Sequence, residues 1–297
     1  MPELVSIDGL TAVAVPADAG AATGVGGRPK PPVLFVHGMM VGAWVFERYQ
    51  RLFAAHGYAS WAVNLRGHCG SRPVPDLGRV SLQYYVNDAM EAARALAAAH
   101  GVERPVIVGH SMGGLIAQVL AERDAVEAAV LLCSAPPRGI TVSSLRLAYH
   151  QLRYLWPILR GRPLVARPAG ASALNFNRVP PAERAGLYAR MVPESGRVGL
   201  ELSLGMVSVD DRRVTRPVLV CAAADDRLVP ARVARRLAKK YDAPYREFAD
   251  HGHFLVYEPN WEGPATEIAH WLDETVIAMP AATETAAGRR DHRPLTL

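Results

Sequence analysis

One ten-residue stretch constrains this chain more than any other. Residues 105–114 read Pro-Val-Ile-Val-Gly-His-Ser-Met-Gly-Gly, an apolar run followed by the pattern G-x-S-x-G. The run predicts a buried parallel strand, and the residues that follow, 115–123, predict a helix. A serine at such a strand-to-helix turn is held in a strained conformation with its hydroxyl exposed above a sheet. Side chains two residues before and after Ser111 would collide, which explains Gly109 and Gly113, and Gly114 leaves room for the helix to pack closely.

Strand and helix patterns alternate along most of the chain. A hairpin is predicted over residues 3–15, with Asp8-Gly9 as its turn. Further strands are predicted at 33–36, 60–65, 106–108, 128–133, 217–223 and 245–248, and helices at 44–56, 82–100, 115–123, 231–241 and 261–278. Strands that alternate with helices form a mostly parallel sheet covered on both faces, so we predict the α/β class.

One interval breaks this alternation and predicts an insertion. Between Ala135 and Arg216 no strand is indicated, and the helical stretches 144–159, 182–191 and 194–204 are separated by prolines. The interval leaves the carboxyl edge of a central strand, where open α/β sheets bind ligands. We therefore predict a helical lid over residues 136–215.

The predicted organisation is a core of residues 1–135 and 216–279, the lid, and a disordered tail over 280–297. Aromatic residues of the lid could line a pocket or hold the lid to the core: Tyr149, Tyr154, Trp156, Phe176 and Tyr188.

Composition excludes several classes of protein. Of 297 residues, 50% are hydrophobic and 21% charged, which fits a globular chain of one α/β domain with an insertion, or of two domains. The net charge of +5 comes from arginines without a dense run or an aromatic-interleaved patch, so we do not expect nucleic-acid binding. Three cysteines, Cys69, Cys133 and Cys221, argue against a disulfide framework, and the last two lie in strand-like runs, as core residues do.

The chain carries no predicted membrane or secretion signal. Its first residues lack a basic region and a long apolar stretch, and no run approaches the roughly 18 apolar residues of a membrane span. We expect a soluble, cytoplasmic protein with a small-molecule substrate and neither a cofactor nor a metal. Its oligomeric state stays open.

A serine nucleophile needs a base, and the base needs a group that orients it. Asp225 and Asp226 both follow the predicted strand 217–223, and because neighbouring side chains point in opposite directions only one can face the base. His251 and His253 compete for the role of base.

A set of features in chain order resembles the α/β-hydrolase family over roughly residues 30–278. They are His37-Gly38 after a strand, Asn64-Leu65-Arg66-Gly67-His68, the G-x-S-x-G turn, Asp226-Arg227-Leu228-Val229-Pro230, and Gly252-His253. The family's triad runs serine, acid, histidine in chain order. The resemblance implies Asp226 as the acid, four residues before the proline that starts the next helix, and His253 as the base. Some members carry the acid one strand earlier, but residues 133–136 contain no carboxylate.

The resemblance also implies an oxyanion hole made of the backbone N–H groups of Met39 and Met112. The loop 37–44 is similar to that of the methylesterase and hydroxynitrile-lyase branch, but those lyases carry a lysine directly after the histidine, where Phe254 stands here. Cyanohydrin cleavage is therefore disfavoured. Asn64 replaces an aspartate common in the family, which affects loop anchoring. A serine at 111 argues against dehalogenases and epoxide hydrolases, which need a carboxylate nucleophile.

The leading hypothesis is a serine hydrolase that cleaves a carboxylic ester, thioester or lactone of a small, largely apolar substrate through an acyl-serine. Trp44, Tyr149 and Trp156 are candidate substrate-binding residues. One alternative is a lyase, eliminase or C–C bond hydrolase on the same scaffold in a bacterial secondary-metabolite pathway, since an Ala- and Arg-rich composition is typical of high-GC bacteria. Another is a hydrolase-like binding protein without turnover.

Overall fold

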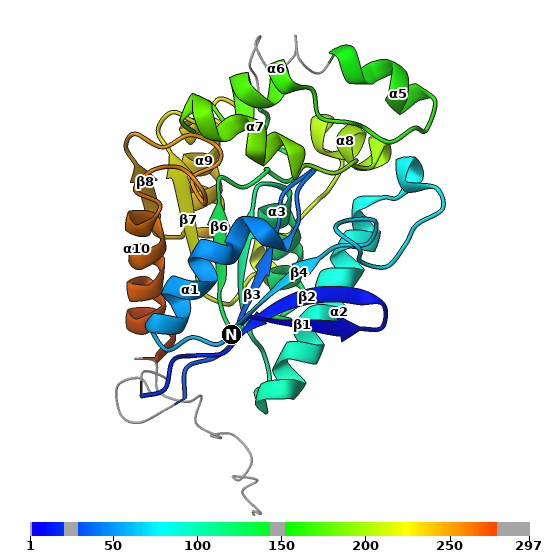
Figure 1. The fold of residues 1–297 in the computed structure, drawn as a ribbon. Helices are drawn as coiled ribbons and strands as arrows, with labels where there is room; N and C mark the ends of the chain where they lie inside the picture. The colour runs from blue at the N-terminus through cyan, green and yellow to red at the C-terminus, as the bar shows by residue number, and fades with distance from the viewer. Residues whose placement is uncertain (1, 21–28, 143–151, 278–297) are drawn as a thin grey trace, which may run out of the picture.

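The computed structural model describes residues 2–20, 29–142 and 152–277. Eight strands form one sheet in the order β1-β2-β4-β3-β5-β6-β7-β8 (Figure 1). The strands are β1 (Glu3–Ile7), β2 (Leu10–Val15), β3 (Val33–Val36), β4 (Ser60–Asn64), β5 (Val106–His110), β6 (Ala129–Leu132), β7 (Val218–Ala223) and β8 (Tyr245–Phe248). Pairing is antiparallel from β1 to β2 and from β2 to β4, and parallel throughout the rest. The predicted α/β class is confirmed.

The first two strands form the predicted hairpin. Ile7 pairs with Leu10 across a two-residue turn, and Asp8 and Gly9 both have positive φ angles, 44° and 83°. This backbone conformation is the one that a two-residue turn needs to match the twist of the strands, and aspartate and glycine adopt it readily.

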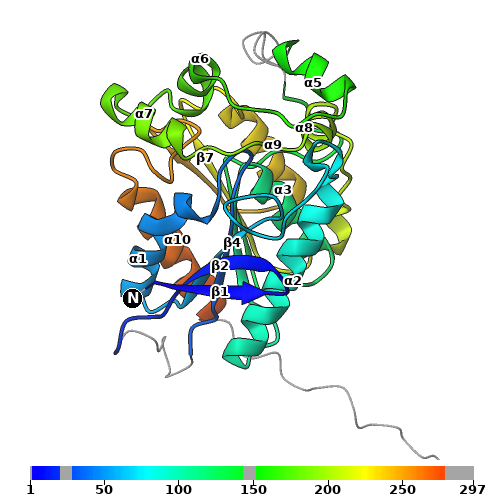
Figure 2. The same ribbon diagram turned by 45° about the vertical axis from the view of Figure 1, so that its right-hand side comes forward.

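Helices cover both faces of the sheet, as Figures 1 and 2 show. One face packs against α1 (Glu47–Ala55), which follows the short turn η2 (Ala43–Phe46), and α10 (Glu262–Leu272); the other packs against α2 (Leu82–His100), α3 (Met112–Glu122) and α9 (Ala231–Tyr241). Alternate residues of each strand serve the two cores. In β3, Leu34 and Val36 join the α2–α3–α9 side, while Val33 and Phe35 join the α1–α10 side. All four are buried, as a strand inside a doubly covered sheet requires.

We call residues 136–215, between β6 and β7, the inserted segment. Its described elements are η4 (Leu152–Tyr154), α5 (Leu155–Leu159), α6 (Pro168–Gly170), η5 (Ala171–Asn175), α7 (Pro181–Ala189), α8 (Gly196–Ser203) and η6 (Asp211–Arg213). The described helices from α5 to α8 lie over the carboxyl ends of the parallel strands (Figures 1 and 2), whereas the last turn, η6, lies at the far end of α3, where Asp210 N donates to Glu122 Oε1. In the part of the segment that the structure describes, β pairing is limited to one isolated bridge, between Leu164 and Glu194.

Several predicted boundaries need correction. The helix predicted at 194–204 begins only at Gly196, because the Ser195 side chain caps it by accepting a hydrogen bond from Val198 N, which leaves Glu194 in the bridge. The helical turns α6 and η5 were not predicted. The last predicted helix ends at Leu272 and continues as the π turn η7 (Asp273–Ile277). Residues 143–151 and the predicted tail 280–297 lie outside the described residues.

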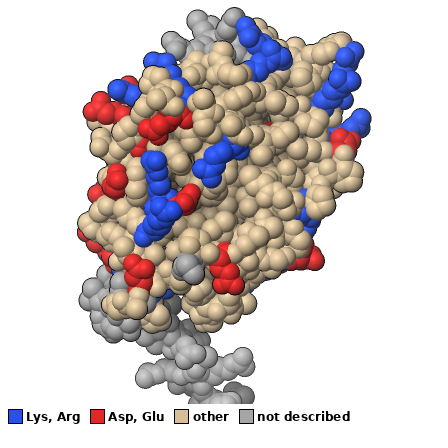
Figure 3. Space-filling view, viewed as in Figure 1, with Lys and Arg blue, Asp and Glu red and all other residues tan. Residues whose placement is uncertain are grey.

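Charged side chains of both signs are scattered over the face drawn in Figure 3, among many uncharged residues. Several form ion pairs; Arg72, for example, contacts Asp8, Asp88 and Glu91. Among the described helices, none is both long enough and apolar enough to cross a bilayer.

Candidate active site

Ser111 occupies a sharp turn between β5 and α3. Its φ and ψ angles are 55° and −115°, a strained conformation for a residue with a side chain. The glycines around it are sterically required. A Cβ on Gly109 would lie 2.1 Å from Gly113 O, and a Cβ on Gly113 would lie 2.1 Å from Val36 O. Gly114 is also confined, but by Ser134 beyond β6, where a Cβ would lie 2.4 Å from Oγ.

A hydrogen-bonded series links three side chains at the carboxyl edge of the sheet. His253 Nε2 lies 3.0 Å from Ser111 Oγ, and His253 Nδ1 lies 2.8 Å from Asp226 Oδ2. Because a carboxylate can only accept, Nδ1 carries the proton, and Nε2 is left to accept the hydrogen bond of the serine hydroxyl. All three residues are buried. The arrangement can therefore remove the proton from Ser111 as its oxygen attacks.

The two adjacent aspartates have different partners. Asp226 turns inward, and its second oxygen, Oδ1, accepts hydrogen bonds of 2.8 Å from the backbone N–H groups of Leu228 and Val229. Asp225 turns outward with its side chain 42% exposed and pairs with Arg178 of the inserted segment. Asp226 is thus the aspartate that contacts the candidate base.

The other histidines near the site form hydrogen bonds with backbone groups. His251 Nδ1 donates to Ala249 O at 2.8 Å, away from Ser111. His110 Nε2 donates to His253 O at 2.8 Å, and burial, followed by the charge of His253, lowers the pKa of His110 to about 3. His37 Nδ1 donates to Gly38 O while its Nε2 accepts from Leu65 N, and burial followed by His68 lowers its pKa to about 3. Both His37 and His110 are therefore neutral and position loops.

The loop after β3 passes close to the serine. A Cβ on Gly38 would lie 3.1 Å from Ser111 Cβ, so the backbone that leads to Met39 runs beside the serine. Neither Met39 N nor Met112 N donates a hydrogen bond to an acceptor in the described part of the chain. Met112 is also the first residue of α3, where the helix dipole favours negative charge. Further along the loop, Asn64 Oδ1 accepts from Ala43 N at 2.7 Å, the anchoring role expected of this position.

A pocket of about 450 Å³ opens above Ser111, within the size range of small-molecule sites. Its walls come mainly from the inserted segment, together with the loops after β3 and β7. Three arginines line the pocket, Arg138, Arg153 and Arg167, but most of the lining is apolar and includes Met39, Met40, Ile140, Leu164, Leu174, Met191, Leu202, Leu228 and Val229.

Most of the aromatic residues named from the sequence lie elsewhere. Tyr154 lines the pocket, whereas Trp156 is 59% exposed beneath the guanidinium of Arg160 and is absent from the lining. Trp44 also lies outside the lining and packs between Phe254 and Tyr257. Tyr149 lies outside the described residues.

The remaining two aromatic residues stabilise the inserted segment, one against the core and one within the segment. Phe176 is buried and packs against Phe254, with ring centroids 5.0 Å apart. The hydroxyl of Tyr188 donates to Ala166 O at 2.9 Å, within the segment.

One neighbour of the triad was not anticipated. Cys133 is a buried core residue, as predicted, but its sulfur also lies within 4.8 Å of a carboxylate oxygen of Asp226 and a ring nitrogen of His253. Burial, and after it the charge of Asp226, raises the pKa of Cys133, so it stays a thiol. The three side chains could together ligate a metal ion, but only by breaking the hydrogen bonds of the series. Cys133 directly follows β6 and has a positive φ of 43°.

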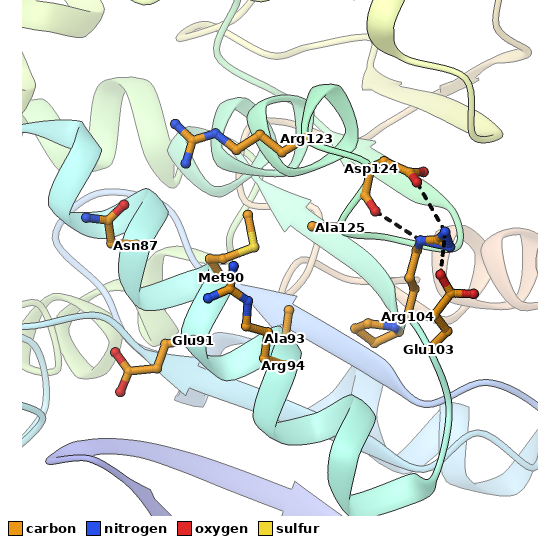
Figure 4. A pocket seen from close by; sticks show the side chains of 11 residues that line it. Asn87, Met90, Glu91, Ala93, Arg94, Glu103, Arg104, Arg123, Asp124 and Ala125 are labelled. Carbon is orange, nitrogen blue, oxygen red and sulfur yellow. Dashed lines mark hydrogen bonds and ion pairs between the residues drawn. The ribbon is translucent and has the colours of Figure 1, made fainter.

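A second hollow, of about 730 Å³, lies at the opposite end of the sheet (Figure 4). It is bounded by α2, the loop before β5 and the turn after α3, and its Arg104 is paired with Glu103 and Asp124. It contains none of the triad side chains. Ligands of parallel sheets bind at the carboxyl ends of the strands, which favours the smaller, apolar pocket over Ser111.

Comparison with known proteins shows the family of this chain. A model of the alpha/beta hydrolase family matches residues 33–269. Probable esterase PIR7A of Oryza sativa subsp. indica is 37% identical over 106 residues, but that match covers only 35% of this chain and 39% of the rice protein. The pimeloyl-[acyl-carrier protein] methyl ester esterase of Chromobacterium violaceum is 28% identical over 249 residues, covering 78% of this chain and 91% of that one.

Among solved structures, a soluble variant of monoglyceride lipase from Saccharomyces cerevisiae superposes with a TM-score of 0.70 at 16% identity, over 92% of this chain and 94% of the other. That likeness concerns the fold. The family model extends from β3 into α10 and so includes the serine turn and both of the strand ends that hold its partners. The chain therefore belongs to the alpha/beta hydrolase family.

Proposed function

We propose that this chain is a serine hydrolase that cleaves a carboxylic ester, thioester or lactone of a small, largely apolar substrate through an acyl-serine intermediate. One observation carries the proposal: the hydrogen-bonded series Asp226–His253–Ser111 ends at a serine that lines a largely apolar pocket. Curated relatives named as esterases support the reaction class.

The reaction would proceed in two halves. Ser111 Oγ attacks the carbonyl carbon while its proton passes to His253 Nε2, and the oxyanion accepts hydrogen bonds from the N–H groups of Met39 and Met112. The carbonyl re-forms as the leaving group departs with the proton from His253. Water then attacks the acyl-serine, gives a proton to His253, and releases the acid as that proton returns to Ser111. Asp226 holds the ring of His253 throughout.

The inserted segment would act as the lid of this pocket. It supplies most of the walls, and two ties near the site fasten it to the core: Asn177 Nδ2 donates to Asp225 O at 3.0 Å, and Arg178 pairs with the Asp225 side chain. A wall built on a segment outside the sheet can vary in shape while the triad stays fixed.

Labelling with a fluorophosphonate probe tests the proposal. Wild-type protein is expected to form a covalent adduct on Ser111 and to hydrolyse p-nitrophenyl esters of short acids, and Ser111→Ala is expected to do neither, with kcat lower by about 10⁴-fold. Turnover by the alanine variant without any adduct on the wild type would contradict the proposal. It would leave His253 as a lone base, as in an elimination.

A further inference from the structure

The inserted segment carries a buried carboxylate that the proposed mechanism does not use. Glu194 is fully buried in the bridge with Leu164, and its carboxylate has four hydrogen-bond partners within the protein. Oε1 accepts from the hydroxyl of Tyr85 and from Ser195 N, both at 2.7 Å. Oε2 faces His68 Nε2 at 3.2 Å and accepts from Met40 N at 3.1 Å. Burial of a carboxylate costs free energy of desolvation unless its oxygens accept hydrogen bonds, as they do here. We therefore ask what Glu194 contributes to the site.

The partner of Glu194 in the core is a histidine whose two ring nitrogens both donate. His68 Nδ1 lies 2.9 Å from Arg66 O, and Nε2 faces the carboxylate, so neither neighbour can supply a proton. Burial alone would lower the pKa of His68, but the Glu194 carboxylate and the hydrogen bonds raise it above its ordinary value. The result is a buried ion pair between the core and the inserted segment.

Residues 192–194 of the inserted segment hydrogen-bond to both the N–H and the C=O of Met40, in the loop after β3. Val192 N donates to Met40 O at 2.9 Å, and Met40 N donates to Glu194. Met40 has a φ of 63°, an unfavourable conformation for a residue with a side chain, which persists only where its surroundings enforce it. Met39, the preceding residue, is the proposed oxyanion donor.

We propose that Glu194 is a positioning residue for the oxyanion hole: it holds the Met40 peptide so that Met39 N–H points at the oxyanion. The inference rests on the proposed function, since it assumes a reaction in which an oxyanion develops. Oxyanion donors act only when they lie within about 2.7–3.1 Å of that oxygen. A small shift of the loop therefore reduces the stabilisation of the transition state more than it reduces the affinity for the substrate.

Comparing Glu194→Gln with Glu201→Gln tests this inference. Glu201 is a matched control, because it lies in the same segment, is 7% exposed, and ties the segment to the core by accepting from Leu82 N at 2.8 Å. The hydrogen bonds of its carboxylate go to Leu82 N and to Arg197 Nε, outside the Met39–Met40 loop. In Glu194→Gln an amide NH₂ must face N–H or O–H donors. We expect kcat for a p-nitrophenyl ester to fall about 10–100-fold with KM within about threefold, and Glu201→Gln to stay within about threefold of wild type.

A thionoester substrate separates positioning from general loss of structure. Sulfur accepts hydrogen bonds poorly, so an intact oxyanion hole discriminates between the ester and its thiono analogue. We expect the ester-to-thionoester ratio of kcat/KM to fall by about tenfold or more in Glu194→Gln and to be unchanged in Glu201→Gln, because the two perturbations act on one interaction. If Glu194→Gln does not fold, Glu194→Asp keeps the charge but retracts the carboxylate, and the same drop in the ratio is expected.

The outcomes distinguish the inference from the function on which it rests. If the wild type neither labels with fluorophosphonate nor hydrolyses esters, the proposed function fails. If the wild type is active and the substituted Glu194 protein keeps the wild-type ester-to-thionoester ratio, the proposed function stands and the positioning role of Glu194 is overturned.

Discussion

Two neighbouring carboxylates show how a single residue position decides the chemistry. Asp225 and Asp226 are adjacent in the chain, yet Asp225 pairs with Arg178 at the surface and Asp226 pairs with His253 in the interior. The backbone explains the difference. Asp225 N donates to His251 O, while the N–H groups of Leu228 and Val229 converge on Asp226 and hold its carboxylate against the ring.

Substituting each aspartate separately measures that difference. Asp226→Asn is expected to lower kcat/KM for a p-nitrophenyl ester by about 10⁴-fold, because an amide can donate to His253 Nδ1 and thereby select the wrong tautomer. Asp225→Asn removes only a half-exposed ion pair, and we expect a change within about threefold. The two kcat/KM values decide the assignment, and a larger loss in Asp225→Asn would reverse it.

At the scale of elements, the turn between β5 and α3 depends on close backbone contact. Gly113→Ala would place a Cβ 2.1 Å from Val36 O, at the carboxyl end of the central strand β3, and neither backbone can move away cheaply. We expect this variant to lose about 3 kcal/mol or more of unfolding free energy in urea titrations, or to fail to fold.

Gly186→Ala is the matched control. Gly186 lies inside α7 with nothing within 4 Å of the added Cβ, so the substitution is expected to stabilise the protein by up to about 1 kcal/mol. Equal effects of the two substitutions would show that the backbone contact at Gly113 is not limiting.

The helix α8 forms one wall of the pocket, so a larger side chain there should shorten the site. Leu202→Trp is expected to reduce kcat/KM for octanoate esters relative to acetate esters by about tenfold or more, since one or two excluded methylenes are each worth roughly 1 kcal/mol. Leu159→Trp, at a residue of α5 that is 68% exposed and outside the pocket lining, should leave the chain-length preference unchanged. An unaltered preference in Leu202→Trp would mean that acyl chains bind elsewhere.

At the scale of the whole molecule, the ion pair of His68 and Glu194 makes the attachment of the inserted segment depend on pH. The pKa of His68 is raised above its ordinary 6.5 and that of Glu194 is lowered below 4.5, despite burial of both. Stabilisation through His68 is thus complete below pH 6.5 and is lost as pH rises through its folded pKa; stabilisation through Glu194 is lost only on acidification below pH 4.5.

The expected result is a pH-dependent difference between wild type and His68→Gln. In urea titrations, the wild type should be more stable by about 3 kcal/mol at pH 6, and the difference should shrink as the pH rises above 6.5 through the folded pKa of His68. The neighbouring His37 and Tyr85 stay neutral over this range, because burial lowers the pKa of His37 to about 3 and raises that of Tyr85. A difference that does not vary with pH would mean that His68 is uncharged in the folded protein.

Local patterns predicted the sheet and the edge at which the site lies, but they left two candidates each for the acid and the base, and the resemblance to the α/β-hydrolase family selected Asp226 and His253 as partners of Ser111. Each of these side chains follows a strand, and parallel strands bring such residues to one edge. The pocket walls were harder to predict. An aromatic side chain such as Trp156 can lie on either side of a short helix, and the deciding contacts are made by the tertiary packing of the inserted segment. Glu194 was placed in a helix, since partners 126 and 154 residues away leave no local pattern.

The connection between β6 and β7 has a consequence for how this protein can diversify. These strands are direct neighbours in the sheet, so the segment between them can be exchanged without altering any strand pairing. Substrate selectivity can therefore change, in evolution or by engineering, while the triad stays the same. The two hydrogen bonds to Met40 limit such exchanges. A segment from another protein would change the lining of the pocket, but it would support fast turnover only if it also supplied an acceptor for Met40 N and a donor for Met40 O. Chimaeras without these two hydrogen bonds are expected to bind substrate well but to turn it over slowly.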